Sequence, residues 1–279
     1  MALPGGIHMD GELRRDFRFR PITGGLELML SESVQYADNH ALRVTTVLCQ
    51  ALETLGGAPA SAEAVRGLSV GDRQFLMARL AAHIHDLPVW VTAHCGHCQE
   101  PFDTSYRYAD VPVKTAGADY PRTQVDTHFG SLNVHVPTGA DQERIANASD
   151  HAEAMRLLLR GIVEGANMDT EFDPEVLSVA DIAAIEQQVE AIAPEVATEL
   201  LAQCPHCGTD NAVTINLYAC LARPIDELFA EIHIIASHYH WSEQAILDMP
   251  RHRRQTYLRH IDSSRGMYGP ADFIQATQD

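Results

Sequence analysis

The chain has 279 residues, of which 46% are hydrophobic, and a formal net charge of −18 at pH 7. That length and apolar content allow one large or two ordinary domains with a buried core. The negative charge disfavours non-specific binding to nucleic acid or acidic membranes, and without a run of about 18 apolar residues we expect no transmembrane helix. The N-terminal stretch lacks the apolar centre of a secretory signal. We therefore expect synthesis in the cytoplasm, where six cysteines favour metal binding or free thiols over disulfides.

The first part of the chain, residues 17–115, is predicted to form a repeat rich in helices. Apolar residues recur at helical spacing in residues 26–38 and 40–55. Further on, Ser69 is followed three residues later by Asp72, which is the pattern of a helix N-cap with an acid in the first turn. We expect a helix to begin there.

A loop at 109–130 leads into a second predicted repeat, residues 130–222. Residues 151–165 have the composition and apolar spacing of a helix. Ser178 is followed by Asp181, so the N-cap pattern of the first repeat recurs. The two repeats are therefore expected to share a local plan.

Each repeat is predicted to end in a turn that carries a Cys-x-x-Cys pair. The pairs are Cys95 with Cys98, and Cys204 with Cys207. Gly96 and Gly208 are expected to supply the turn conformations. Residues 88–95 read as a strand that enters the first turn, and residues 211–218 alternate as a strand that leaves the second. Residues 195–204 have a helix-forming composition, and their state stays open.

A constant offset of 109 residues relates the two repeats. It separates Leu-Ser-Val-Gly-Asp at 68–72 from Leu-Ser-Val-Ala-Asp at 177–181, and it also separates Cys95 from Cys204. Upstream, a Thr-Gly stretch occurs in each repeat, at a different offset: RPITGGLE at 20–27 and VPTGADQE at 136–143. We interpret the chain as an internal duplication whose two cysteine turns meet across a pseudo-twofold axis.

The two cysteine pairs together have the signature of a four-thiolate zinc site. We therefore predict one structural Zn²⁺ per chain, resembling a zinc ribbon, with Cys95, Cys98, Cys204 and Cys207 as ligands. His97 and His206 lie inside the turns but are not needed, because four thiolates complete a tetrahedron. The alternatives are two unrelated buried thiol pairs and a redox dithiol, which the equal offsets disfavour.

The composition changes at residue 223, and residues 223–265 read as a helical docking tail with no counterpart in the first repeat. A helix is expected at 224–239, a short one after Ser242, and a third at Pro250. Aromatic residues and arginines are enriched at interface hot spots. The predicted partner-binding residues are Trp241, Arg251, Arg253, Arg254, Tyr257 and Arg259. The alternatives are a DNA-reading helix-turn-helix, and packing of Trp241 onto the second repeat.

A catalytic function is not indicated. The sequence contains no phosphate-binding loop, no nucleophile elbow and no convincing acid–base pair. The histidines at 83–85 and 233–240 are expected at the surface or in the core. The expected fold class is α+β and mostly helical: a duplicated body with a shared cysteine site, and a helical tail. We expect a non-enzymatic protein without a small-molecule substrate.

Several short motifs resemble the baseplate hub family of T-even-type phages, often described as hub assembly chaperones. The motifs are Arg20-Pro21-Ile22-Thr23-Gly24, Gly71-Asp72-Arg73 and the pair Cys95/Cys98. The Tyr-His-Trp-Ser segment at 239–242 is similar to one in small proteins of contractile phage tails and contractile injection systems. The resemblance implies a structural or chaperone component of a contractile-tail baseplate. Such a component would contact other hub proteins in the cytoplasm during assembly or in the particle.

Two other functions stay open at the level of sequence. One is a zinc-ribbon regulator that binds nucleic acid, and the other is a thiol oxidoreductase or zinc hydrolase. The net charge disfavours the first, and a closed four-thiolate site disfavours the second.

Overall fold

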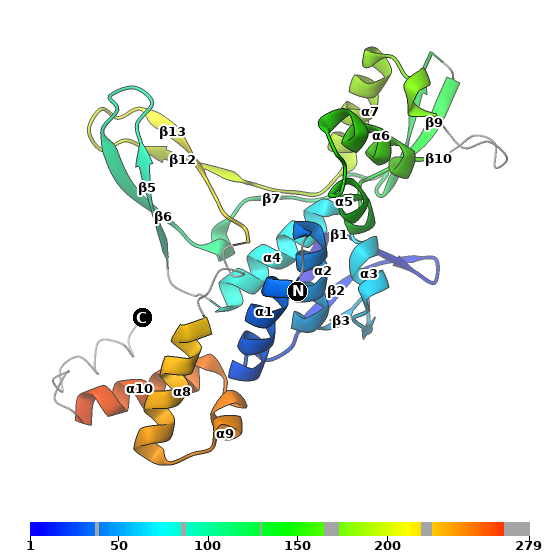
Figure 1. Cartoon of the computed structure of the whole chain (residues 1–279). Helices are drawn as coiled ribbons and strands as arrows, with labels where there is room; N and C mark the ends of the chain where they lie inside the picture. Colours follow the sequence, from blue (N-terminus) through cyan, green and yellow to red (C-terminus); the bar gives the residue numbers. More distant parts are fainter. Residues whose placement is uncertain (37–38, 85–87, 129, 165–172, 219–224, 265–279) are drawn as a thin grey trace. The chain divides into compact units, whose positions relative to one another are not determined.

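The computed structural model describes residues 1–36, 39–84, 88–128, 130–164, 173–218 and 225–264. Helices and strands mix along these segments, which confirms the predicted α and β content (Figure 1). The chain divides into two compact units. Unit 1 is Met1–Phe19 with Tyr36–Cys220, and unit 2 is Arg20–Gln35 with Leu221–Asp279. Residues 20–35, which the sequence assigns to the first repeat, therefore belong with the C-terminal tail.

The first part of unit 1 is an antiparallel sheet with strand order β1-β2-β3-β4. Its strands are β1 (Ala2–Met9), β2 (Glu12–Phe19), β3 (Leu52–Leu55) and β4 (Ala58–Pro59). Asp10 and Gly11, with φ of 53° and 81°, form the two-residue turn between β1 and β2. The helices are α2 (His40–Ala51), α3 (Ala62–Gly67) and α4 (Val70–Ile84). The helix predicted at 40–55 is shorter than expected, because its last turn is strand β3.

The second part of unit 1 repeats this order with a smaller sheet, β10-β9-β8. Its strands are β8 (Arg122–Thr127), β9 (Gly130–His135) and β10 (Val163–Glu164). Its helices are α5 (Gly139–Ile145), α6 (His151–Ile162), the short 3₁₀ helix η2 (Pro174–Val176) and α7 (Val179–Ile192). Val134, Leu159 and Ile185 are fully buried between the sheet and helices α6 and α7.

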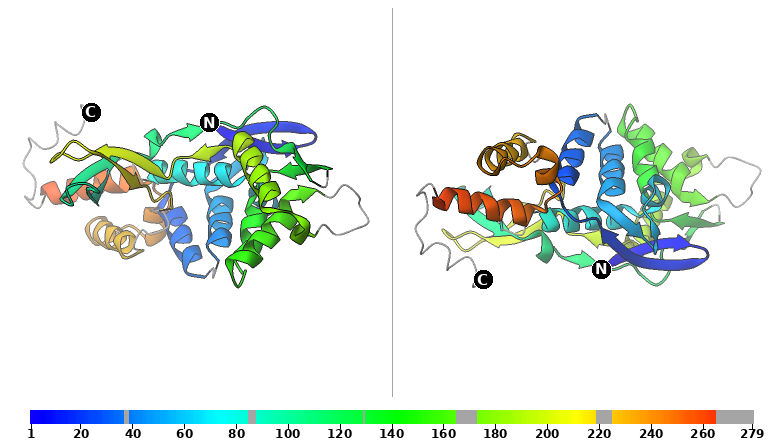
Figure 2. Two further views of the ribbon diagram at one scale, coloured as in Figure 1. Left: turned by 90° about the horizontal axis from the view of Figure 1, so that it is seen from above. Right: turned by 90° about the horizontal axis from the view of Figure 1, so that it is seen from below.

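Two hairpins complete unit 1, and they lie side by side (Figures 1 and 2). They are β5 (Val89–His94) with β6 (Pro101–Tyr106), and β12 (Glu199–Gln203) with β13 (Asp210–Thr214). The short 3₁₀ helix η1 (Tyr108–Asp110) follows β6, and strand β7 (Val113–Lys114) pairs with β11 (Glu195–Val196). Residues 195–204, undecided from composition, are thus mainly strand, because each part has a pairing partner.

Helices α4 and α7 begin as predicted. Ser69 Oγ donates to Asp72 Oδ2 at 2.8 Å and accepts from the Asp72 amide at 3.1 Å. Ser178 and Asp181 form the same reciprocal pair, at 2.6 Å and 3.2 Å. In both helices the serine accepts from an amide of the first turn that has no partner inside the helix. Only α7 has a complete capping box, because the Asp181 carboxylate also accepts from the Ser178 amide at 2.8 Å.

The Gly71-Asp72-Arg73 motif is a packing centre of unit 1. A Cβ on Gly71 would lie 1.9 Å from the carbonyl oxygen of Pro194. The Asp72 carboxylate accepts from the amides of Gly5 and Gly6, at 2.8 Å and 3.1 Å. Arg73 is buried, and its guanidinium donates to three acceptors: Ala41 O at 2.7 Å, Thr45 Oγ1 at 2.9 Å and Val65 O at 3.3 Å. The motif therefore joins α4 to β1, α2 and α3.

Unit 2 is helical. Its described helices are α1 (Gly24–Tyr36), α8 (Ile225–Tyr239), α9 (Glu243–Leu247) and α10 (Arg251–Ser264). Ser242 Oγ accepts from the Ala245 amide at 3.3 Å, and Pro250 directly precedes α10. The three predicted helices of the tail are confirmed. Their apolar side chains form one core, with Ile235, Ile246 and Ile261 fully buried and Leu28 of α1 packed against it.

Two helices of the tail match two helices of the first repeat in order and in spacing. Helix α9 corresponds to α3, and α10 corresponds to α4, because both pairs of helices begin 181 residues apart. Ser61, which caps α3 through the Ala64 amide, corresponds to Ser242. Arg73 corresponds to Arg254, and both arginines are buried. Few identities accompany this match, so it is visible only in the structure.

Candidate metal centre

The cysteine turns sit at the tips of the two hairpins, and the hairpins share one register. Ala93 pairs with Phe102 in the first, and Ala202 pairs with Asn211 in the second. In each turn the amide of the first cysteine bonds to a carbonyl five residues on: Cys95 N to Glu100 O at 3.0 Å, and Cys204 N to Thr209 O at 2.9 Å. The offset of 109 therefore holds for backbone hydrogen bonds as well as for sequence.

Each turn contains one residue in the left-handed conformation, directly after its second cysteine. These residues are Gln99, with φ of 64°, and Gly208, with φ of 76°. Gly208 acts as predicted, because glycine adopts this conformation at no steric cost. Gly96 lies in the first turn as predicted, but the left-handed residue there is Gln99. Gly96 instead donates its amide to Asn211 Oδ1 at 2.9 Å, across to the other turn.

The four predicted ligands meet at one point. Cys95 Sγ lies 3.5 Å from Cys207 Sγ, and Cys98 Sγ lies 3.8 Å from Cys204 Sγ. All four sulfur atoms lie within 4.8 Å of one another, close enough to hold a metal ion. A tetrahedron with Zn–S bonds of about 2.3 Å has S···S edges of about 3.8 Å. The separations are far longer than a disulfide bond of about 2.05 Å. Each hairpin supplies two of the sulfurs, as the sequence predicts.

The surroundings of the sulfurs suit a closed site. Cys95 and Cys204 are fully buried against Phe102, whereas Cys98 is half-buried and Cys207 is exposed. His97 and His206 are exposed and lie outside the group of residues within ligand distance.

Hydrogen bonds and neighbouring sulfur atoms shift the pKa values of Cys207 and Cys98 in opposite directions. Hydrogen bonds from the side chain and the amide of Thr209 lower the pKa of Cys207 to about 5. The Glu100 amide lowers the pKa of Cys98, but burial and the three neighbouring sulfurs outweigh it and raise that pKa to about 12. Four thiolates in contact repel one another, so complete deprotonation of the cluster requires a cation among them.

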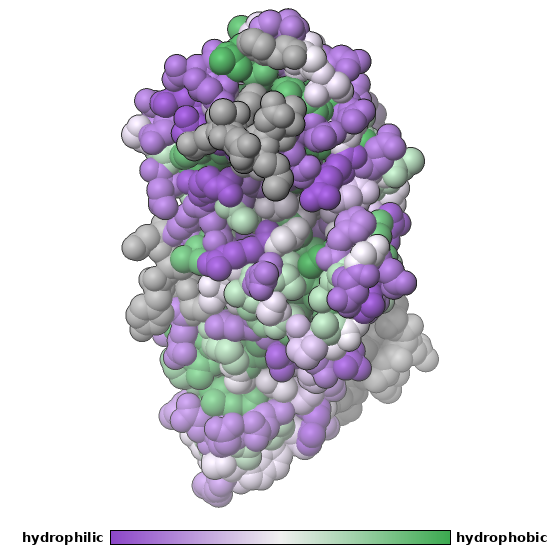
Figure 3. Space-filling model, turned by 90° about the vertical axis from the view of Figure 1, so that its right-hand side faces the viewer, coloured by the Kyte–Doolittle hydropathy of each residue, from purple (hydrophilic) through white to green (hydrophobic). Residues whose placement is uncertain are grey.

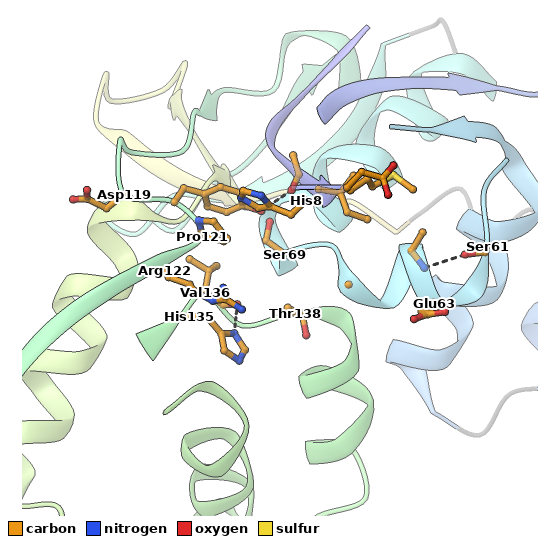
Figure 4. A pocket seen from close by; sticks show the side chains of 17 residues that line it. His8, Ser61, Glu63, Ser69, Asp119, Pro121, Arg122, His135, Val136 and Thr138 are labelled. Carbon is orange, nitrogen blue, oxygen red and sulfur yellow. Dashed lines mark hydrogen bonds between the residues drawn. The ribbon is translucent and has the colours of Figure 1, made fainter. Parts of the chain in front are cut away.

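A separate cleft of about 880 Å³ opens in unit 1, lined by residues of β1, α3, β8 and β9 (Figure 4). His8, Arg122 and His135 are among its polar residues. His135 Nε2 lies 2.8 Å from Gly161 O, and Nδ1 lies 3.0 Å from Val136 O. Each ring nitrogen thus lies within hydrogen-bond distance of a backbone carbonyl oxygen, which holds the ring of His135 against β9 and the end of α6.

Among the predicted partner-binding residues, Arg254 has a different position from the one expected. Its side chain is 0% exposed. Its guanidinium donates to Glu27 Oε1 at 2.5 Å, to Glu231 Oε2 at 3.0 Å and to Met249 O at 2.8 Å. Arg254 therefore holds α1, α8 and α10 together and cannot contact a partner in this fold.

The two predicted aromatic residues pack inside unit 2. The ring centroids of Trp241 and Tyr239 are 4.8 Å apart and stacked, and Tyr257 meets Trp241 edge-on at 4.9 Å. All three are half-buried. Arg251 is half-buried too, whereas Arg253 and Arg259 are exposed on α10 beside His252. The surface that α10 offers is therefore basic, with the aromatic cluster beneath it.

Large exposed hydrophobic side chains are few among the described residues. Hydrophilic residues dominate the face shown in Figure 3, and hydrophobic ones occur there as small separate groups. The most exposed, apart from Met1, are Val179 at 85%, Leu201 at 80% and Trp90 at 70%. Sequence patterns did not indicate them, because exposure depends on which neighbours the fold brings.

No protein-family model, curated protein or solved structure matches the chain. In the part of the chain that the structure describes, every helix is too short or too polar to cross a bilayer.

Proposed function

We propose that the chain is a scaffold held together by one structural Zn²⁺ ion, bound by Cys95, Cys98, Cys204 and Cys207. The observation that carries this proposal is the convergence of four sulfur atoms at separations that match a tetrahedral ZnS₄ site. Thiolates favour Zn²⁺ over Mg²⁺ or Ca²⁺, which prefer oxygen ligands. A site of four thiolates has no open position for water, so the role of the ion is structural.

We further propose that unit 1 is an internal duplication joined at this ion. Three observations support it: the common register of the two hairpins, the matching hydrogen bonds of the cysteine turns, and the reciprocal serine–aspartate hydrogen bonds at Ser69 and Ser178. The zinc ion would then link the two repeats, and each would supply half of the ligands.

The experiment for the metal is direct. The protein, purified under reducing conditions without added metal, is expected to contain one zinc per chain by mass spectrometry. Replacing Cys204 with Ser should remove the metal, whereas replacing the half-buried Cys49 with Ser should retain it. A metal-free protein, or one with two zinc ions, contradicts the shared site. A disulfide within either pair, Cys95–Cys98 or Cys204–Cys207, favours the thiol oxidoreductase instead.

We propose that this scaffold is a non-enzymatic structural or assembly component of a contractile-tail or injection-system baseplate, acting in the cytoplasm. The support is the resemblance of its Arg-Pro-Ile-Thr-Gly, Gly-Asp-Arg and Tyr-His-Trp-Ser motifs to that class. Four thiolates around one ion leave no open coordination position for water or substrate, and this supports a role without catalysis at that site.

The basic surface of α10 is the proposed contact with an acidic baseplate protein. It comprises His252, Arg253 and Arg259, and arginines bind carboxylates through paired hydrogen bonds. Removing the whole tail is a poor test, because α1 would lose the helices it packs against. Replacing Arg253 and Arg259 with Glu is cleaner, since both side chains are exposed.

The matched control replaces two exposed arginines of α6, Arg156 and Arg160, with Glu, which gives the same change of charge. We expect the α10 variant to be lost from purified baseplate particles and the α6 variant to be retained. Normal incorporation of both variants contradicts the proposed surface. Salt-sensitive DNA binding that the α10 variant loses favours the nucleic-acid regulator.

A further inference from the structure

Three long helices of the chain start in the same way. The two residues before each helix are an apolar residue and then Ser or Pro. We call these two residues, together with the first residue of the helix, a cradle. The three cradles are Leu68-Ser69-Val70 before α4, Leu177-Ser178-Val179 before α7, and Met249-Pro250-Arg251 before α10.

Two cradles hold a Thr-Gly segment of the chain in a short antiparallel bridge. Thr138 pairs with Ser69 and Thr23 pairs with Pro250. The hydrogen bonds are the same in both. The glycine amide donates to the first cradle residue: Gly139 N to Leu68 O at 3.0 Å, and Gly24 N to Met249 O at 3.2 Å. The third cradle residue donates back: Val70 N to Pro137 O at 3.0 Å, and Arg251 N to Ile22 O at 3.3 Å.

Side chains seat each segment further. An apolar residue just before the Thr-Gly step is buried: Val136 in one case and Ile22 in the other. The glycine lies against the buried arginine of the cradle helix, so that a Cβ would be 2.2 Å from Arg73 at Gly139 and 3.0 Å from Arg254 at Gly24. A helix then begins, α5 or α1. The seated segment is thus an extended apolar stretch that enters a helix through Thr-Gly.

The cradle before α7 has the same Leu-Ser-Val sequence as the cradle before α4, and its serine makes the same hydrogen bonds to the aspartate three residues on. It carries no such segment among the described residues. Ser69 is buried and Val70 half-buried, whereas Ser178 and Val179 are exposed. Val179 is 85% exposed and the neighbouring Val176 is 44% exposed. The side chains of Val176 and Val179 therefore lie beside the Val179 amide and the Leu177 carbonyl. The corresponding amide and carbonyl groups are hydrogen-bonded to a Thr-Gly segment in the other two cradles.

We propose that the Leu177-Ser178-Val179 cradle docks an extended segment of a partner protein that leads into a helix through a Thr-Gly step. The segments in the two occupied cradles indicate what kind of segment would bind here. The main-chain hydrogen bonds of an added strand do not depend on particular side chains, whereas the pockets beside the strand favour apolar side chains. Ile182 stands where the other cradle helices have arginine, which favours an apolar contact.

The occupant is a different protein, not a second copy. The chain contains two Thr-Gly steps, at 23–24 and 138–139, and both are seated in its own cradles. The inference rests on the proposed role in protein docking, but it is independent of the zinc ion and of α10.

The test uses a synthetic peptide with the sequence of residues 134–147, labelled with a fluorophore, and the full-length protein. We expect the peptide to bind, and Val179→Asp to weaken its binding at least tenfold. Leu201→Asp is the matched control, since Leu201 is equally exposed on β12. A peptide with N-methylglycine in place of Gly139 cannot donate the bridge hydrogen bond and should fail to bind.

Absence of binding to the unmodified protein overturns the proposal, as does equal weakening by Val179→Asp and Leu201→Asp. Sedimentation of the protein alone decides the occupant: a dimer that Val179→Asp dissociates would show that a second copy fills the cradle. None of these outcomes decides the proposed function, which is tested independently by the zinc content of the protein and by its incorporation into baseplate particles.

Discussion

Asp72 and Asp181 lie 109 residues apart and each accepts a hydrogen bond from the hydroxyl of the serine three residues before it, yet the pKa values of their carboxyl groups are shifted in opposite directions. Burial raises the pKa of Asp72, even though the amides of Gly5 and Gly6 and the Ser69 hydroxyl stabilise the charge. The Ser178 hydroxyl and the amide of His128 lower the pKa of Asp181 well below its usual range. The same motif therefore makes opposite contributions to stability as the pH changes.

For Asp72, stability is expected to fall as the pH rises. A carboxyl group whose pKa is raised by folding contributes fully below its unfolded pKa of about 3.9, and this contribution is lost as the pH passes the folded pKa. Asp72→Asn should therefore destabilise the protein less at pH 7 than at pH 4, measured by urea unfolding. A larger loss at pH 7 would show that the charged form is the favoured one.

For Asp181, stability is expected to rise as the pH rises. A lowered pKa contributes stability above the unfolded value of about 3.9, and this contribution disappears as the pH falls toward the folded pKa. Asp181→Asn should destabilise the protein more at pH 7 than at pH 3 in the same measurement. An equal loss at both pH values would mean that the carboxylate charge is not what Ser178 and His128 stabilise.

Removal of the metal is expected to unfold the region that the two hairpins form. The binding energy of a structural zinc site is on the order of 10 kcal/mol and is coupled to folding. A chelator should lower the melting temperature strongly in the native protein and leave Cys95→Ser unchanged, because that variant has no metal to lose. Cys49→Ser should respond to the chelator as the native protein does.

Replacing Arg254 with Met should destabilise unit 2 by about 3–5 kcal/mol, because Glu27 and Glu231 would stay buried without their cation. Arg253→Met is the control: this neighbour is exposed, and its loss should cost no more than about 0.5 kcal/mol. Thermal unfolding of both variants gives the comparison. Similar effects would place Arg254 at the surface.

Gly71→Ala should cost about 1–3 kcal/mol or more, because its methyl group would meet the carbonyl oxygen of Pro194 and backbone cannot move aside cheaply. Gly67→Ala, where a Cβ would meet nothing within 4 Å, is expected to be neutral or slightly stabilising. Chemical denaturation of both variants measures the difference.

Features that depend on neighbouring residues could be predicted from local patterns in the sequence. The Cys-x-x-Cys turns, the helix N-caps at Ser69 and Ser178 and the helix after Ser242 were predicted correctly, because each needs only a few residues in a fixed local order. The constant offset of 109 residues also predicted that the four cysteines lie close together, as they do in the structure.

Features that depend on a distant partner could not be predicted from local patterns. Residues 195–204 are strand despite a helix-forming composition, because pairing with β7 and β13 outweighs local preference. Residues 20–35 join the tail, because Arg254 and the core of unit 2 bind them across more than 200 positions of sequence. Burial of Arg254 and exposure of Val179 follow from the same cause: a side chain's surroundings are set by packing, which no local pattern records.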